Sequence, residues 1–91
     1  RGEQSYRVEL KFTPDAGKIV TETVWHPTQQ AKAHKDGSVT LTFQVNGLNE
    51  ILHWVLSWAG RVTIQPPDEL KALFLKTLHD AIQMPAPTGD A

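Results

Sequence analysis

The stretch from Leu52 to Leu70, LHWVLSWAGRVTIQPPDEL, constrains the fold most, because it holds a helix end, one short strand and a helix start. Gly60 is typical of a helix C-terminus, and Val62 and Ile64 alternate with polar neighbours as in a half-buried strand. The Pro-Pro-Asp-Glu run that follows is typical of a helix N-terminus. A strand this short between two helices predicts an α+β domain in which other segments complete the sheet.

Three other segments have the pattern of strands. Apolar and polar residues alternate over 6–12 and 39–45, and a weaker alternation runs over 29–34. Between the last two, Asp36-Gly37 is typical of a hairpin turn, because glycine accepts a positive φ without a Cβ clash. With the strand at 62–64, the sequence therefore predicts a sheet of four strands.

Three helices are predicted. The first begins at Thr13-Pro14-Asp15, and Ala16, Ile19, Val20 and Thr23 are expected on its core side. The other two, over about 48–58 and 68–84, carry apolar residues around roughly 200° of their circumference at 100° per residue. One face of a sheet seldom covers so wide a surface, so we expect part of both faces to be buried elsewhere.

The element order β, α, β, β, α, β, α predicts a ferredoxin-like βαββαβ sandwich. Its antiparallel sheet has the expected strand order 4-1-3-2, with two helices on one face and an additional C-terminal helix. The outer face is expected to carry Arg7, Glu9, Lys11, Gln30, Lys32, Thr40, Thr42, Gln44, Arg61, Thr63 and Gln65. With four cations and one acid, that face is locally basic although the chain has a net charge of −1.

The composition is that of a small globular domain. The chain has 91 residues, 40% of them apolar, and no cysteine, which excludes disulfides and thiolate metal sites and is compatible with a cytoplasmic location. No apolar run approaches the length of a membrane span, so no membrane role is expected. The missing initiator Met suggests a fragment, with residues 1–5 as a linker remnant, 6–84 as the domain and 85–91 as a flexible tail.

Several residues resemble the WCX domain in order and spacing over nearly the whole chain. They are Phe12, Trp25-His26-Pro27-Thr28-Gln29, Asp36-Gly37, Trp54-Val55-Leu56-Ser57, Gly60, Val62, Pro66 and Leu70. The resemblance implies the C-terminal extension of bacterial transcription regulators that also carry an upstream helix-turn-helix and a WYL domain. Some of these regulators respond to DNA damage, bind single-stranded DNA as an effector and dimerise. The chain departs from the family at Met84-Pro85, where an aromatic residue is common.

The basic residues Arg7, Lys11, Lys32 and Arg61 are candidate contacts for the phosphates of an anionic effector such as single-stranded DNA. A merely solvated sheet face is the competing interpretation. The predicted face lacks aromatic residues for base stacking, so Trp25 and His26 from a loop are candidates for that role. A core-lid role for Trp25 and a capping or packing role for His26 are the alternatives.

The candidate interface residues are Trp54, Trp58, Leu75 and Ile82. Trp54 and Trp58 lie one turn apart on the same side of their helix, so they either pack against the last helix or form an interdomain or dimer surface. We expect a homodimer in the full-length protein.

Catalysis and metal binding are not expected, and no cofactor is implied. The four histidines, His26, His34, His53 and His79, have no ligand spacing. Acylphosphatases share the predicted fold, but their glycine-rich anion loop after the first strand is replaced by Thr13-Pro14-Asp15. The leading hypothesis is a regulatory and dimerisation domain. The alternative is an ACT-like small-molecule-binding or purely structural assembly module with no nucleic-acid role.

Overall fold

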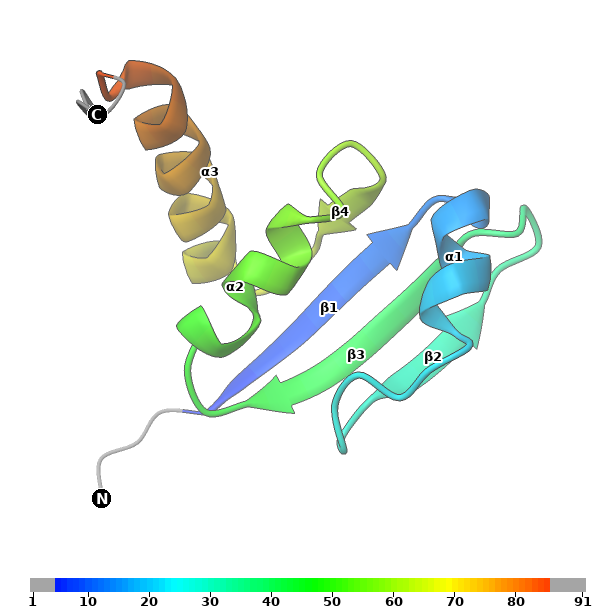
Figure 1. Cartoon of the computed structure of the whole chain (residues 1–91). Coiled ribbons are helices and arrows are strands. Elements are labelled where there is room, and N and C mark those ends of the chain that lie inside the picture. Colours follow the sequence, from blue (N-terminus) through cyan, green and yellow to red (C-terminus); the bar gives the residue numbers. More distant parts are fainter. Residues whose placement is uncertain (1–4, 86–91) are drawn as a thin grey trace.

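The computed structural model describes residues 5–85, which form a four-stranded antiparallel sheet and three helices (Figure 1). In chain order the elements are β1 (Tyr6–Phe12), α1 (Pro14–Val20), β2 (Gln30–Ala33), β3 (Val39–Val45), α2 (Asn49–Leu56), β4 (Val62–Ile64) and α3 (Asp68–Gln83). Every expected element is present in the expected order. Most of the predicted linker (1–4) and tail (86–91) lies outside the described residues.

The two long strands form the middle of the sheet. β1 and β3 pair along their whole length, from Tyr6 opposite Val45 to Phe12 opposite Val39. The short strands β2 and β4 form the edges, giving the order β2-β3-β1-β4. Read from the other edge, this is β4-β1-β3-β2, the order expected from the sequence.

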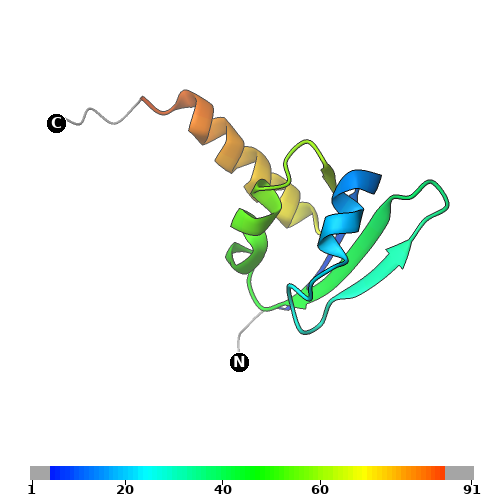
Figure 2. The same cartoon turned by 45° about the vertical axis from the view of Figure 1, so that its right-hand side comes forward.

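The core lies between one face of this sheet and the helices α1 and α2, which lie on the same side of it (Figure 2). Alternation places the apolar residues of β1 and β3 on that side. The largest fully buried side chains are Phe12, Phe43, Leu10, Leu41, Leu70, Val8, Val20, Val45 and Val55. The alternation of apolar and polar residues in β1 and β3 is thus enough to define which face of the sheet the helices cover.

Helix α1 approaches the sheet through a glycine. A Cβ on Gly17 would lie 2.7 Å from Val39 Cγ2, so the close contact between α1 and β3 requires the absence of a side chain there. Ala16 and Val20 share this buried side. Ile19 and Thr23 were expected on it too, and this is wrong. Ile19 is 46% exposed, because the helix turns its Gly17 side toward β3, and Thr23 is exposed beyond the end of the helix at Val20.

The predicted Asp36-Gly37 turn joins β2 to β3. Gly37 has a φ of 91°, and the Asp36 carboxylate accepts hydrogen bonds from the backbone N–H (2.9 Å) and hydroxyl (2.6 Å) of Ser38. These bonds, the hydroxyl bond first, lower the pKa of Asp36 below its ordinary value. The turn is therefore stabilised by a carboxylate that stays ionised.

Helix α3 leaves the body of the domain (Figures 1 and 2). Leu70 in its first turn is fully buried, and Leu73 and Phe74 pack partly against the core. Beyond them, Leu75 and Ile82 are 67% and 78% exposed.

No helix within residues 5–85 is long and apolar enough to cross a membrane.

Candidate functional site

The loop between α1 and β2 carries the Trp25-His26-Pro27-Thr28-Gln29 run, and its own side chains fix its shape. Trp25 Nε1 donates a hydrogen bond to the carbonyl oxygen of Val20 at the end of α1 (3.0 Å). The Gln29 side chain accepts from the backbone N–H of Trp25 (2.8 Å) and donates to the carbonyl of Thr23 (3.2 Å). The motif thus folds the loop back on the end of the helix.

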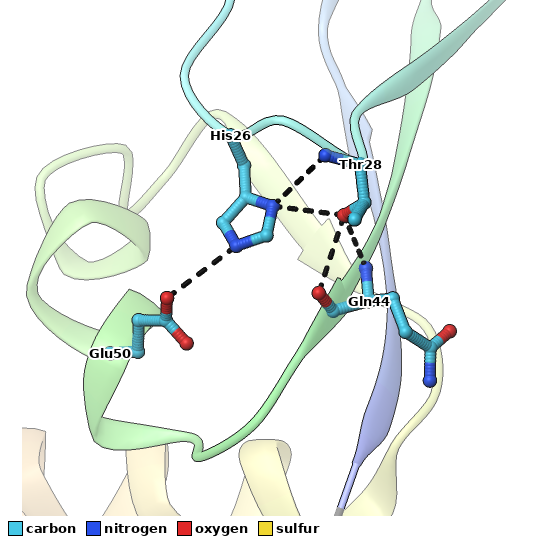
Figure 3. Close-up of polar contacts among 4 residues, drawn as sticks. All are labelled: His26, Thr28, Gln44 and Glu50. Atoms are coloured by element: carbon cyan, nitrogen blue, oxygen red, sulfur yellow. Dashed lines mark hydrogen bonds and ion pairs between the residues drawn. The ribbon is translucent and has the colours of Figure 1, made fainter.

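Thr28 ties the same loop to the sheet and to His26 (Figure 3). Its hydroxyl oxygen accepts from the backbone N–H of Gln44 in β3 (2.8 Å) and lies 2.9 Å from His26 Nδ1. The backbone N–H of Thr28 also donates to His26 Nδ1 (3.2 Å), and the Thr28 hydroxyl donates to the carbonyl oxygen of Gln44 (3.3 Å). Nε2 faces the carboxylate of Glu50 at 3.4 Å. The His26 ring is therefore held between Thr28 of its own loop and Glu50 of α2.

Trp54 of α2 lies at the centre of an aromatic cluster. Its ring contacts those of Phe12 and Phe43 at 5.8 and 5.9 Å in edge-to-face geometry, and that of Trp25 at 5.3 Å. Edge-to-face pairs of this kind stabilise a core by about 0.5–1.5 kcal/mol each beyond their area burial. The cluster joins the loop, α2 and the sheet into one packed unit.

A pocket of about 210 Å³ opens between the loop and α2. Its walls are Trp25, His26, Phe43, Glu50, Ile51 and Trp54. Trp25 is 42% exposed and the Glu50 side chain 48% exposed, so an aromatic ring and a carboxylate are both accessible from solvent. We define these six residues as the aromatic pocket.

The face of the sheet opposite the helices carries three of the four predicted cations. Lys32, Thr40, Lys11 and Thr63 form one row across the four strands. The Arg7 guanidinium pairs with Glu9 at 3.1 Å, which leaves the row of lysines as the main positive charge of this face. We call Arg7, Lys11 and Lys32 the basic sheet face.

Arg61 does not join the basic sheet face, and the prediction that it does is wrong. Its guanidinium lies 5.1 Å from the Trp58 ring centre and 3.4 Å from Asp15 of α1. Both partners belong to the helix-covered side, and the cation–π contact with Trp58 draws the side chain there. A hydrogen bond from the Thr13 hydroxyl lowers the pKa of Asp15, and a hydrogen bond from Arg61 lowers it further.

The candidate residues therefore separate into four places. Trp25, His26 and Trp54 meet in the aromatic pocket, on the opposite side of the sheet from Arg7, Lys11 and Lys32. Trp58, a candidate interface residue, is only 9% exposed and packs edge-to-face on Phe12. Leu75 and Ile82 are exposed on α3.

Sequence reasoning missed Glu50, Phe43 and Ile51 as pocket residues. Phe43 and Ile51 carry only the apolar signal of core positions. Glu50 is one of several acids in first helical turns, where a carboxylate is favoured by the helix dipole in any case. Only the fold of the preceding loop brings His26 to it, and no local pattern encodes that contact.

A known protein family matches this chain by sequence. The sequence model of the WCX domain matches residues 4–82, which is most of the chain. The chain belongs to the WCX domain family.

No curated protein matches it significantly. Within the WCX domain, the described residues contain no group of three or more His, Asp or Glu side chains placed to hold a metal ion.

Proposed function

We propose that this WCX domain is the C-terminal regulatory and dimerisation domain of a bacterial WYL-type transcription regulator located in the cytoplasm. The observation that carries the proposal is the exposed side of α3. Leu75, Leu78 and Ile82 recur at helical spacing along it and are 67%, 37% and 78% exposed. An apolar stripe on a projecting helix is a surface for a second helix, and the simplest partner is the same stripe on a second copy.

The self-association is tested by sedimentation of the 91-residue chain over a range of concentrations. We expect a concentration-dependent dimer that Leu75→Glu together with Ile82→Glu dissociates, because each change buries a carboxylate against an apolar partner. Met84→Glu is the matched control, since Met84 is also 67% exposed but lies just beyond the helix. A strict monomer at every concentration would overturn the dimer and assign the stripe to the upstream WYL domain.

The proposal includes an anionic effector, with single-stranded DNA as its leading candidate. The supporting observation is the row of Lys11 and Lys32 on a face that no described element covers, since both lysines are exposed. The row alternates with threonines rather than aromatic residues, so contact would be to phosphates and not to stacked bases.

Titration of a fluorescent single-stranded oligonucleotide into the full-length regulator at two salt concentrations tests the effector. Lys11→Glu and Lys32→Glu are expected to weaken binding and to lower the salt slope by about 0.7 for each phosphate that is no longer neutralised. Lys18→Glu on α1 is the control with equal charge change away from the face. Absence of binding at low salt would favour the competing function, a small-molecule-binding or structural module with no nucleic-acid role.

A further inference from the structure

The aromatic pocket has the size of one side chain or one ring. Its volume is about 210 Å³. Pockets for drug-sized ligands are typically about 300–1,000 Å³, and a cavity of about 150 Å³ accepts benzene. A small group, or the end of a longer molecule, fits these dimensions.

The charge of the pocket selects the sign of its occupant. Glu50 is the one formally charged residue among the six that line it. Within residues 5–85 the Glu50 carboxylate pairs with no Lys or Arg; its one ion-pair contact is His26 Nε2 at 3.4 Å. Neither Lys nor Arg lines the pocket, so the Glu50 carboxylate has no permanent cation opposite it there. An anionic occupant would be repelled.

The walls favour a cation as well. The faces of tryptophan and phenylalanine rings carry negative charge density and attract ammonium and guanidinium groups within about 6 Å. Trp25 and Trp54 lie 5.3 Å apart at 43°, so their faces are inclined to each other rather than stacked flat, and Phe43 and Ile51 supply apolar surface for an aliphatic stem. An aromatic enclosure with one carboxylate at its opening matches an alkyl cation.

We infer that the aromatic pocket binds a cationic alkyl group, an alkylguanidinium or alkylammonium, whose charged head pairs with Glu50 and whose stem lies against the rings. Two sources share this chemistry: a small alkyl cation, and an arginine or lysine side chain of a protein partner. The inference goes beyond the proposed function and is independent of it, because it concerns the other side of the sheet and holds whether or not DNA binds.

The test is an NMR titration of the 91-residue chain, observing the indole N–H resonances of the three tryptophans. Ethylguanidinium is the ligand, N-ethylurea its neutral isostere and acetate the anion control. We expect saturable shifts of Trp25 and Trp54 with ethylguanidinium, at least about tenfold weaker binding of N-ethylurea, and no effect of acetate. Equal binding of the two isosteres would overturn the inference.

Glu50→Gln removes the charge but keeps an oxygen that accepts from His26, so the loop retains its contact. This variant should weaken ethylguanidinium binding about tenfold, the value of a hydrogen bond to a charged group. Glu69→Gln, on α3 and away from the pocket, should leave binding unchanged. An unchanged affinity in Glu50→Gln, with the tryptophan spectrum of the wild type, would also overturn the assignment.

A second ligand distinguishes the two sources. N-acetyl-arginine N-methylamide presents the same guanidinium on a peptide unit. Tighter binding than ethylguanidinium assigns the pocket to a protein partner, whereas equal or weaker binding assigns it to a small cation. If neither guanidinium ligand binds, the pocket is not a cation site.

Discussion

Helices α2 and α3 look alike in sequence and differ in the structure. Both carry apolar residues around more than half of their circumference. In α2 most of that surface is covered by the same domain: Ile51, Leu52 and Val55 are buried, and the Trp54 ring contacts those of Phe12 and Phe43. In α3 only Leu70 is buried, and the apolar residues of the second half face solvent.

The difference shows what amphipathic pattern does and does not determine. The pattern of α2 is satisfied because β1, β3 and the Trp25 loop all converge on it. The pattern of α3 exceeds what its own domain covers, because only its first two turns reach the core. A wide apolar face therefore predicts burial, but the partner that provides it has to be identified from the fold.

The largest test of this contrast is a pair of identical substitutions. Leu52→Ala removes a side chain that is 4% exposed, and we expect a loss of about 2–5 kcal/mol in the free energy of unfolding. Leu75→Ala, at 67% exposure, should change it by no more than about 0.5 kcal/mol. Urea denaturation at low protein concentration measures both without a contribution from self-association. Equal losses would mean that α3 packs as tightly as α2.

A smaller effect is expected where α1 touches the sheet. Gly17→Ala places a methyl group 2.7 Å from the stiff, buried Val39 side chain, and overpacking of this kind costs about 1–3 kcal/mol. The helical gain of alanine over glycine, about 1 kcal/mol, offsets only part of it.

Gly47→Ala is the control, because a Cβ there has nothing within 4 Å and the residue lacks a positive φ. Thermal unfolding of the two variants gives the comparison. Stabilisation by Gly17→Ala would show that α1 can move away from β3. The contact of α1 with the sheet would then be looser than that of α2.

The smallest effect concerns the exposed half of α3 and its pH dependence. Lys76 Nζ donates to Asp80 Oδ2 at 2.8 Å, and this bond lowers the pKa of Asp80 below 3.8 and raises that of Lys76. Since the folded pKa of Asp80 is the lower one, its contribution is present above about pH 4 and is lost as the pH falls through the folded value. The protection of amides 76–83 against exchange, measured relative to an unfolded peptide at the same pH, should therefore fall below about pH 4 more than the protection of α2 amides.

Lys76→Gln should remove that difference between the two helices. Lys71→Gln should not, because Lys71 lies 3.8 Å from a largely exposed Asp68 at the other end of α3. If Lys76→Gln leaves the pH dependence of exchange unchanged, the pair does not stabilise the exposed half of the helix.

Much of the fold follows from local patterns. Alternation of apolar and polar residues located β1 and β3. The Asp36-Gly37 pair located the hairpin turn between β2 and β3, and Pro66-Pro67-Asp68 located the start of α3. These signals depend on residues within a few positions of each other. Ile19 was misplaced because the side that α1 turns to the sheet is decided by Gly17 against Val39, a contact between residues distant in the chain.

The candidate site was less predictable for the same reason. Trp25 and His26 stood out in the sequence, but their neighbours Phe43 and Glu50 come from later elements. Arg61 was assigned by alternation to the outer face, and its contacts with Trp58 and Asp15 outweigh that alternation just before a strand of only three residues. Side-chain direction outside regular strands depends on tertiary partners.

The attachment of α3 by one end has a mechanical consequence. A helix fixed near Leu70 and free beyond Phe74 is a lever, and the distance from Leu70 to Ile82 is about 18 Å at 1.5 Å per residue. A tilt of about 10° at the fixed end displaces the far end by about 3 Å over that length. A small change of packing beneath the buried Leu70 would therefore be amplified at the exposed end of α3, the surface proposed for a second subunit.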